Sequence, residues 1–407
     1  MRFWGITGTN GKTTTTWITA EFINAAKDRK CGYVTTVEVN TGSRQFYTGY
    51  TTPPLAQLKE IFAEMEANGC TDCVMEVSSH AIHQHRTGDT VFSGGVFTNL
   101  SEDHLDYHKT MEAYFDVKLD FARQIAAAHP TTPDMGRRDL PPYVVCLDGG
   151  YGKEMFNAVG NLAVNVIPVS LTRAKAKGEG EQRNLISAVG LGSSRFDLSE
   201  LQLVGDYNKS NVLCAAALAE AAGVPHDAIQ TVIPTLMPRW GRLEEVKSKS
   251  EKVKSRVFVD FAHTPDGLEK VLAAARGFTP EGKKLWIVFG AGGDRDPMKR
   301  PLMGEACAKL ADRLVVTSDN PRSEDPLKII DAIVEGVKSV DRSTFNLQPS
   351  TFLFVEPDRA KAIALALSRA DEKDVVIIAG KGHETTQEIK GVKHPFDDRE
   401  VVRNFAG

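Results

Sequence analysis

The sequence has few of the features that direct a protein to a membrane, to nucleic acid or to an oxidising compartment. No apolar run is long enough to cross a bilayer, and a glycine-rich motif begins almost at the N-terminus, where a secretory signal would carry its apolar core. The formal net charge is −4, so no overall positive field would attract nucleic acid or anionic lipid. Six cysteines in 407 residues are too few for a disulfide framework, which indicates a reducing compartment. We therefore expect a monomeric cytoplasmic protein that acts on small molecules, with neither nucleic acid nor a membrane as its partner.

The first sixteen residues, MRFWGITGTNGKTTTT, predict a phosphate-binding loop. A short apolar strand is followed by a glycine-rich turn, and Lys12 and Thr13 open a helix. Glycines let backbone N–H groups surround phosphate oxygens, and a helix N-terminus adds further N–H groups and the positive end of its dipole. Lys12 would contact the β- and γ-phosphates, and Thr13 would offer its hydroxyl to Mg²⁺. The match is incomplete because Ile6 stands where the standard loop has its first glycine, so a glycine-rich turn without a ligand is the alternative.

Strand and helix patterns alternate along the rest of the chain. This alternation predicts an α/β fold with doubly wound, mainly parallel sheets, and the length suits two or three domains. The helical pattern breaks near Thr235–Trp240, where MPRW introduces a proline, and a new series of strands and helices follows. We predict a central P-loop-type, ATP-binding domain over residues 1–238 and a C-terminal Rossmann-like domain over residues 239–407. The polar run 171–184 predicts a loop or a hairpin tip.

Polar residues follow two further apolar strands of the first domain. Glu76 ends one strand and Asn99 ends the next, so both should converge with the glycine-rich turn at the carboxyl edge of the sheet. Glu76 is a candidate Mg²⁺ ligand, with an exposed strand-end carboxylate as the alternative. His104, in SEDHLDYH, is either a ligand of a second Mg²⁺ or a capping or packing residue. Lys118 taken alone is expected to be a surface lysine.

Histidines and cysteines near the strand that ends at Glu76 offer two further interpretations. His80, His83 and His85 form HxxHxH, but no partner set with the usual spacing of a zinc site is apparent. Cys70 and Cys73 form a lone CxxC, and the apolar residues after it favour packing over a redox or metal role.

The second half of the chain repeats the pattern of an apolar strand followed by a polar loop. Arg295 follows one strand, Asn320 and Arg322 follow another, and Glu384 follows a third. Guanidinium, amide and carboxylate groups at neighbouring strand ends suit an amino acid, because arginine pairs with a carboxylate through two hydrogen bonds. Ordinary loop polarity is the alternative.

Together these motifs resemble the Mur ligases of peptidoglycan synthesis, and among them the MurE branch, which adds meso-diaminopimelate. They occur in family order over nearly the whole chain. The matching runs are GITGTNGKTTT, TTP, MEVSSHAIHQHR, FTNLSEDHLDYHKTMEAY, LVGDYNKSN, VDFAHTPDGLEK, VFGAGGDRDPMKRPLMG, TSDNPRSEDP and AGKGHETTQ.

The resemblance implies ATP and Mg²⁺ as cofactors and assigns roles to individual residues. The implied catalytic residues are Lys12, Glu76, His104 and Lys118. The implied metal ligands are Thr13, Glu76, His104 and Lys118. Lys118 would bind as an N-carboxylated (carbamate) lysine, which replaces its interpretation as a surface residue. The implied ATP contacts are Gly8, Thr9, Asn10, Gly11, Lys12, Thr13, Thr14, Asn208, Arg242, Asp260 and His263. The implied acceptor contacts are Thr51, Thr52, Ser78, Gln84 and Arg86. The implied amino-acid contacts are Arg295, Asn320, Arg322, Gly380 and Glu384.

The implied activity is an ATP-dependent, ADP-forming amide ligase that adds an amino acid to a D-Glu-type carboxylate through an acyl phosphate. The DNPR run is the form found in ligases that add meso-diaminopimelate. Two departures from the family pattern leave alternatives open. The family's N-terminal domain, which binds the UDP of the acceptor, is not in this sequence, and MPRWGRLEEV differs from the usual run around Arg242. The alternatives are a related ligase that uses a small or free-peptide acceptor without UDP, and a non-catalytic ATP-binding protein.

Overall fold

A computed structural model describes residues 1–132, 134–171, 185–187, 195–340 and 352–406. The chain forms two compact units. Unit 1 comprises Met1–Ser101 and Tyr107–Met237, and unit 2 comprises Glu102–Asp106 and Pro238–Gly407. The division after Met237 lies one residue before the predicted boundary. Apart from Leu171, the polar run predicted as a loop lies outside the described residues.

Unit 1 is built on an eight-stranded sheet with the order β4-β3-β2-β5-β1-β6-β7-β8. Neighbouring strands from β2 to β8 in this order are parallel, and β3 and β4 form an antiparallel edge. In the register, Ile6 of β1 pairs with Glu76 of β5 on one side and with Val96 of β6 on the other. The carboxyl ends of these three strands therefore meet at one edge. The strands are β1 (Arg2–Thr7), β2 (Cys31–Val34), β3 (Val39–Asn40), β4 (Gln45–Phe46), β5 (Asp72–Glu76), β6 (Phe92–Phe97), β7 (Pro142–Cys146) and β8 (Asn165–Val169).

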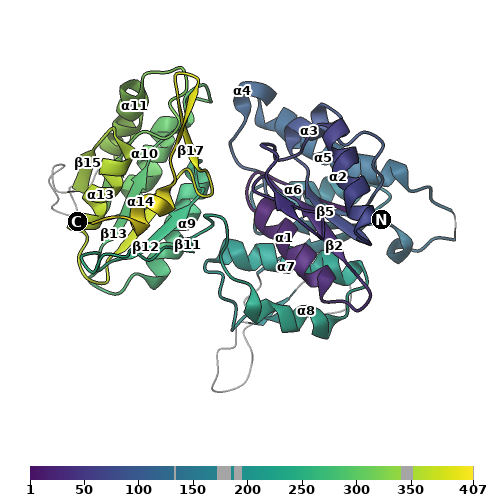
Figure 1. The fold of residues 1–407 in the computed structure, drawn as a ribbon. Coiled ribbons are helices and arrows are strands. Elements are labelled where there is room, and N and C mark those ends of the chain that lie inside the picture. The colour runs from purple at the N-terminus through teal and green to yellow at the C-terminus, as the bar shows by residue number, and fades with distance from the viewer. Residues whose placement is uncertain (133, 172–184, 188–194, 341–351, 407) are drawn as a thin grey trace. The chain divides into compact units, whose positions relative to one another are not determined.

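Helices cover both faces of this sheet (Figure 1). On one face, α2 (Leu55–Ala67), α5 (Met111–Ala128) and α6 (Gly152–Val159) bury their apolar side chains against the strands. On the other face, α1 (Lys12–Asn24) packs against α7 (Asp206–Ala221). Because both faces are covered, β5 is buried along its whole length, including the carboxylates at its two ends. The shorter elements are α3 (Ser79–His83), α4 (Leu105–His108), η1 (Arg137–Asp139), β9 (Leu185–Ser187), β10 (Arg195–Asp197), α8 (His226–Val232) and η2 (Ile233–Thr235).

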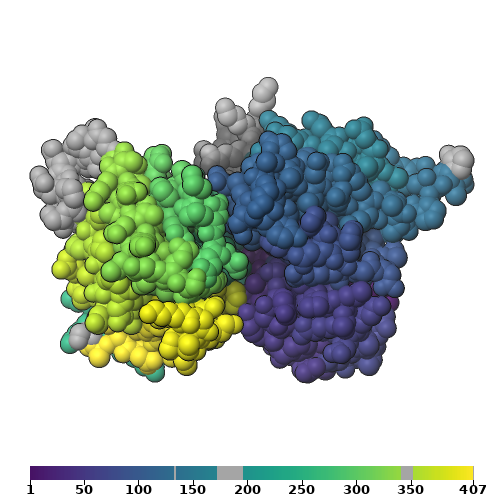
Figure 2. Space-filling view, turned by 90° about the horizontal axis from the view of Figure 1, so that it is seen from above, coloured from purple at the N-terminus to yellow at the C-terminus, as the bar shows by residue number. Residues whose placement is uncertain are grey.

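Unit 2 has a six-stranded sheet with the order β11-β12-β16-β13-β14-β15, parallel except for β11. One face is covered by α9, α10 and α11, and the other by α13 and α14, with an apolar core on each side. The hairpin of β17 and β18 follows β16. β18 is exposed along its length, in the yellow C-terminal part of the surface in Figure 2. The strands are β11 (Glu244–Glu245), β12 (Arg256–Asp260), β13 (Leu285–Phe289), β14 (Arg313–Val316), β15 (Leu353–Val355), β16 (Val375–Ala379), β17 (Thr386–Ile389) and β18 (Val392–Pro395). The helices are α9 (Pro265–Phe278), α10 (Lys299–Leu310), α11 (Pro326–Ser339), α13 (Arg359–Arg369) and α14 (Asp398–Arg403).

Both units are α/β structures with mainly parallel sheets, so the predicted fold class is confirmed. Every helix among the described residues is too short or too polar to span a lipid bilayer.

Candidate active site

The glycine-rich turn connects β1 to α1 at the carboxyl edge of the unit 1 sheet. Gly8 and Gly11 have φ angles of 144° and 83°, which L side chains rarely adopt. A Cβ at Gly8 would lie 1.9 Å from Thr98 Oγ1, and one at Gly11 would lie 2.3 Å from Asn211 Oδ1. Gly11 is the N-cap of α1 and, as a glycine, has no side chain to cap this helix. The turn therefore has the backbone geometry of a phosphate-binding helix N-terminus.

Polar side chains fold over this turn. Lys12 Nζ donates to the carbonyl oxygens of Gly8, at 3.0 Å, and Thr9, at 2.8 Å. The N–H of Asn10 donates to Asn99 Oδ1 at 3.0 Å. The structure thus brings Asn99 to the turn, as the strand-end argument predicts, and it sets the Lys12 ammonium beside the loop.

Glu76 is fully buried at the end of β5. Its Oε1 accepts from Thr13 Oγ1 at 2.7 Å and from the N–H of Thr36 at 2.8 Å, and its Oε2 accepts from Thr36 Oγ1 at 3.0 Å. The alternative of an exposed strand-end carboxylate is therefore wrong, because the parallel register carries Glu76 inward to the start of α1. Thr36 is a part of this arrangement that the sequence analysis missed, since a threonine in the turn after β2 carries no distinctive pattern.

The five predicted acceptor contacts gather around the end of β5. Thr52 Oγ1 donates to the carbonyl oxygen of Glu76 at 2.9 Å and accepts from the N–H of Ser78 at 3.0 Å. Arg86 Nη1 donates to the Thr52 carbonyl oxygen at 3.3 Å, and its Nε donates to Gln84 Oε1 at 2.8 Å. The fifth residue, Thr51, contacts Thr36, since the hydroxyl oxygens of these two threonines are 3.0 Å apart. Thr36 thus links the buried carboxylate to the predicted acceptor residues.

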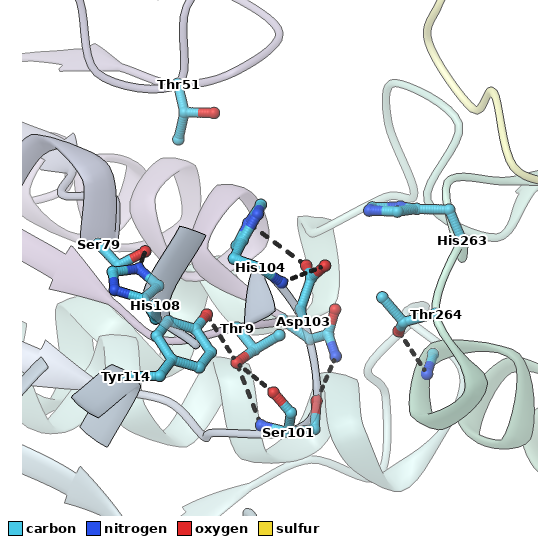
Figure 3. Close-up of polar contacts among 12 residues, drawn as sticks. Thr9, Thr51, Ser79, Ser101, Asp103, His104, His108, Tyr114, His263 and Thr264 are labelled. Atoms are coloured by element: carbon cyan, nitrogen blue, oxygen red, sulfur yellow. Dashed lines mark hydrogen bonds and ion pairs between the residues drawn. The ribbon is translucent and has the colours of Figure 1, made fainter. Parts of the chain in front are cut away.

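An aromatic cluster connects the glycine-rich turn to α3 (Figure 3). Thr9 Oγ1 is 3.1 Å from the hydroxyl of Tyr114, which is buried. The Tyr114 ring stacks on His108 with centroids 4.9 Å apart, and His108 Nε2 is 2.9 Å from Ser79 Oγ. Ser101 closes the turn, because its N–H donates to Thr9 Oγ1 at 3.1 Å. The contacts hold the phosphate-binding turn and the first residue of α3 in one framework, which no local sequence signal indicates.

Lys118 is 1% exposed, so its interpretation as a surface lysine is wrong. It lies on the buried face of α5, and its Nζ donates to Thr7 Oγ1 and to the Gly8 carbonyl oxygen, both at 3.0 Å. The same Nζ is 5.4 Å from the centroid of the Tyr114 ring. The amine therefore lies against the inner side of the glycine-rich turn.

His104 belongs to the short segment that groups with unit 2. Its backbone has φ 56°, its N–H donates to Asp103 Oδ1 at 3.0 Å, and its Nε2 is 3.4 Å from Asp103 Oδ2 (Figure 3). Burial acts to raise the pKa of Asp103, but nearby positive charge, His104 first, outweighs it and lowers that pKa to about 2. The predicted catalytic residues are thus divided, with Lys12, Glu76 and Lys118 in unit 1 and His104 in unit 2.

The predicted nucleotide contacts of unit 2 surround Phe261. The Arg242 guanidinium lies 4.6 Å from the Phe261 centroid, and the His263 ring lies 4.7 Å from it. Asp260 accepts from the N–H groups of Leu243, at 2.6 Å, and Ala262, at 2.7 Å. Burial raises the pKa of Asp260 and lowers that of His263. The remaining nucleotide candidate, Asn208, lies in α7 of unit 1.

Asn208 lies in the first turn of α7, and its Nδ2 donates to the carbonyl oxygen of Val204, just before this helix, at 2.8 Å. Its neighbour Asn211 meets the glycine-rich turn, since a Cβ at Gly11 would lie 2.3 Å from Asn211 Oδ1, which also accepts from Thr15 Oγ1 of α1 at 3.4 Å. Asn211 is therefore a further residue of the phosphate-binding region that the sequence analysis missed.

The predicted amino-acid contacts follow three neighbouring strands of the unit 2 sheet. Asn320 comes after β14 and Glu384 after β16, and Asn320 Nδ2 donates to Glu384 Oε2 at 2.8 Å. Gly380, also after β16, has φ 117°, and a Cβ there would lie 2.4 Å from Asp319 Oδ2. Arg295 is exposed on the loop after β13. The strand ends thus bring an amide and a carboxylate into direct contact.

Arg322 is held by both its backbone and its side chain. Its φ is 51°, its N–H donates to the Glu388 carbonyl oxygen at 3.0 Å, and its carbonyl oxygen accepts from the N–H of Lys390 at 2.6 Å. Its Nη1 donates to the Gly293 carbonyl oxygen at 2.6 Å. The loop after β14 is therefore paired to β17, and the guanidinium lies at the loop after β13.

The histidine and cysteine motifs near β5 make other contacts in the structure. No group of three or more His, Cys, Asp or Glu side chains in the described part of the chain could hold a metal ion. His83 Nδ1 is instead 2.8 Å from the Tyr107 hydroxyl. Cys70 and Cys73 are buried free cysteines, and burial is the largest cause that raises the pKa of each thiol. These cysteines pack in the core, which agrees with the packing interpretation.

Models of two protein domains match the chain over most of its length. The Mur ligase middle domain matches residues 6–219, and the glutamate ligase domain of Mur ligases matches residues 241–382. The chain belongs to the Mur ligase family. The resemblance read from the motifs is therefore confirmed, and with it the enzyme class, because Mur ligases are ATP-dependent, ADP-forming ligases.

Similar proteins and structures agree with this family. UDP-N-acetylmuramoyl-L-alanyl-D-glutamate–2,6-diaminopimelate ligase of Aquifex aeolicus is 37% identical over 99% of this chain and 77% of its own length. The ligase of the same name from Synechococcus elongatus is 39% identical over 99% of this chain and 76% of its own. A solved structure of a ligase of that name is 32% identical, with a TM-score of 0.59 over 99% of this chain and 77% of that one. A pseudomurein peptide ligase type C from Methanothermus fervidus, 16% identical with a TM-score of 0.61 over 94% of this chain and 76% of that one, shares the fold. This Mur ligase thus spans about three quarters of the length of its curated relatives.

Proposed function

We propose that this Mur ligase joins meso-diaminopimelate to the D-Glu carboxylate of UDP-N-acetylmuramoyl-L-alanyl-D-glutamate, with cleavage of ATP to ADP and phosphate. The observation that carries the proposal is the set of groups at the strand ends of unit 2. Asn320, Arg322 and Glu384 offer an amide, a guanidinium and a carboxylate, which together match an amino acid with more than one charged end. The relatives that are 36–39% identical are named as ligases of 2,6-diaminopimelate.

The proposed reaction uses the groups at the carboxyl ends of the strands in the two sheets. The acceptor carboxylate attacks the γ-phosphorus of ATP, the bond to the bridging oxygen breaks, and ADP leaves with the electron pair. The amine of the amino acid then attacks the acyl phosphate, loses a proton, and expels inorganic phosphate as the amide forms. In the first step the Lys12 ammonium and the N–H groups of the glycine-rich turn would bind phosphate oxygens and offset their charge. Thr52, Ser78 and Arg86 would orient the acceptor near the end of β5.

Glu76 and Thr13 fit a magnesium site. Carboxylate and hydroxyl oxygens are hard ligands, and Glu76 is a buried carboxylate that forms no ion pair among the described residues. Mg²⁺ held by them would neutralise charge on the transferred phosphoryl group. Glu76 itself would keep its orientation through the two hydrogen bonds from Thr36.

The other assignments belong to the same proposal. Residues 1–238 would bind ATP and residues 239–407 the amino acid, with Asn208, Arg242, Asp260 and His263 as nucleotide contacts. Lys118, as an N-carboxylated lysine, and His104 would be ligands of a second Mg²⁺. The burial of Lys118 supports a role of this kind, because a buried lysine amine is more readily neutral and nucleophilic than an exposed one. We propose a cytoplasmic monomer.

The test is the mass of the product. The full chain is incubated with ATP, Mg²⁺, meso-diaminopimelate and UDP-N-acetylmuramoyl-L-alanyl-D-glutamate, and phosphate release is followed in parallel with mass spectrometry. The expected product has the summed mass of acceptor and amino acid less one water. L-lysine in place of diaminopimelate, and free L-Ala-D-Glu in place of the nucleotide acceptor, are the comparison substrates. Phosphate release only with one of these comparison substrates, or with none, would overturn the proposal.

A further inference from the structure

A buried lysine that the reaction above does not use lies between two residues of the proposed amino-acid site. Lys381 follows Gly380 at the carboxyl end of β16, and its side chain is fully buried. Its Nζ donates to Glu384 Oε2 at 2.9 Å and to Asn320 Oδ1 at 3.1 Å. Lysine is almost never fully buried unless it is paired, so these two contacts account for its position.

Asn320 has its amide orientation fixed by a backbone group. Its Oδ1 accepts from the N–H of Glu388 at 2.9 Å as well as from Lys381. Because a backbone N–H can only donate, the oxygen of the amide must face Glu388, and Nδ2 must face Glu384. Lys381 and Nδ2 of Asn320 therefore donate to the same oxygen of Glu384, at 2.9 and 2.8 Å.

Glu384 is held through one oxygen only. Both donors engage Oε2, whereas the described residues form no hydrogen bond to Oε1, and the side chain is 33% exposed. A carboxylate fixed in this way presents its second oxygen in a set direction. An ammonium group of the ligand is the matching donor, because charge-assisted hydrogen bonds are the stronger kind.

We propose that Lys381 is a positioning residue that sets the enzyme's preference for an amino acid with a second amino group. It acts through Glu384, whose Oε1 it directs to that group. The inference rests on the proposed function, since it takes the amino-acid site to lie at Asn320, Arg322 and Glu384. A purely structural role, in which Lys381 only offsets the charge of Glu384, would affect folding without changing which amino acid is preferred.

The experiment compares Lys381→Met, Lys381→Arg and the exposed control Lys361→Met in steady-state phosphate release. For Lys381→Met we expect KM for meso-diaminopimelate to rise about tenfold or more, with KM for ATP unchanged within about twofold. The preference for meso-diaminopimelate over 2-aminopimelate, which lacks the second amino group, should shrink by a similar factor. Lys381→Arg, which keeps a cation, should recover part of the preference, and Lys361→Met should match the unmodified chain. In a Glu384→Gln background, Lys381→Met should cause little further change in KM for meso-diaminopimelate or in the preference over 2-aminopimelate.

The outcomes separate the two proposals. An unmodified chain that releases no phosphate with any amino acid overturns the proposed function, and the inference with it. An active chain whose Lys381→Met variant keeps both its KM and its preference overturns the inference alone. Should Lys381→Met fail to fold by circular dichroism, Glu384→Gln decides. The inference requires this variant to lose the preference for the second amino group with KM for ATP retained, and a variant that keeps the preference overturns it.

Discussion

Glu76 receives hydrogen bonds from residues that lie far from it in the sequence. Thr13 and Thr36 are 63 and 40 residues away, and both reach its carboxylate through hydroxyl groups. A carboxylate with this little freedom holds one arrangement of its oxygens before any ligand binds. That property is what a metal site needs, because the binding free energy is then not spent on ordering the ligand group.

Replacement of Thr36 by valine tests this arrangement. Thr36→Val keeps the shape of the side chain and the backbone N–H bond to Glu76 but removes the hydroxyl that bonds Oε2. We expect the Mg²⁺ concentration for half-maximal phosphate release to rise about tenfold, because a hydrogen bond to a charged group contributes about 1.5–3 kcal/mol. Thr36→Ser keeps the hydroxyl and should behave as the unmodified chain. Equal Mg²⁺ dependence in the valine and serine variants would contradict the prediction.

Lys118 is predicted to act in the reaction and not in nucleotide binding. In Lys118→Ala the amine that lies against Thr7 and Gly8 is lost. We expect ligation to fall by about 100-fold or more, the size of effect seen when one preorganised electrostatic group is removed, while a fluorescent ATP analogue still binds. Added bicarbonate should not restore activity. Lys153→Ala, on the exposed face of α6, is the control. Full activity of Lys118→Ala would reject the carbamate.

The positions that could be predicted from sequence are those set by one local motif or by the end of a strand, as for Glu76 and Asn99. Lys12 and Thr13 are fixed by the turn and the helix that follow one strand. Lys118 was misjudged when taken alone because its burial comes from a glycine-rich turn 110 residues earlier, which no helical pattern reports. Thr36 and Lys381 were missed for the same reason, since their partners are set by the packing of distant strand ends.

Asp72 ties three elements together at the start of β5. Its carboxylate accepts from Trp4 Nε1 at 2.9 Å in β1, and from Arg29 Nε at 3.0 Å before β2. Burial alone would raise the pKa of Asp72, but the hydrogen bonds from Arg29, Trp4 and Thr71 outweigh it, and the pKa is lowered. This residue therefore stabilises the sheet at the end opposite to the active site.

Asp72→Asn should lower the free energy of unfolding of unit 1 by about 3 kcal/mol at pH 7, as expected when one partner of a buried ion pair is removed. The pH dependence has a definite sign. Because the folded pKa of Asp72 is below the unfolded value of about 3.9, the unfolded chain binds the extra proton. The contribution is present above about pH 4 and is lost as the pH falls through the folded pKa. Urea unfolding at pH 7 and pH 3 should show the difference between the two proteins shrinking at the lower pH, and a constant difference would contradict it.

At the scale of elements, the alternation of strand and helix patterns was enough to predict the mainly parallel sheets of both units. The order of the strands within each sheet could not be predicted from the sequence. β1 pairs with β5 and β6, which are far along the chain, because register is chosen by burial on both faces and not by sequence distance. The two-residue strands β3, β4 and β11 leave no periodic signal in the sequence, because each pairing involves so few residues.

At the scale of the whole chain, one compact unit gives way to the other after Met237, within the MPRW run. Each unit has its own sheet with apolar side chains buried against it. All five residues predicted to bind the amino acid lie after strands of unit 2, and none of their described contacts requires unit 1. Unit 2 has an apolar core on each face of its sheet, so the chain segment that forms this sheet should fold on its own.

A fragment of residues 238–407 should therefore fold and bind meso-diaminopimelate without the rest of the chain. At 100 times its Kd a ligand stabilises the folded state by about 2.7 kcal/mol, which corresponds to a rise in Tm of roughly 5–10 °C for a domain of this size. Differential scanning calorimetry with and without meso-diaminopimelate measures this directly. Arg322→Ala is the matched variant, because it removes the guanidinium at Gly293 but keeps the backbone bonds to β17. It should unfold near the Tm of the free fragment and show little rise with ligand. A fragment that unfolds cooperatively but does not respond to meso-diaminopimelate would show that unit 2 alone does not hold the amino-acid site.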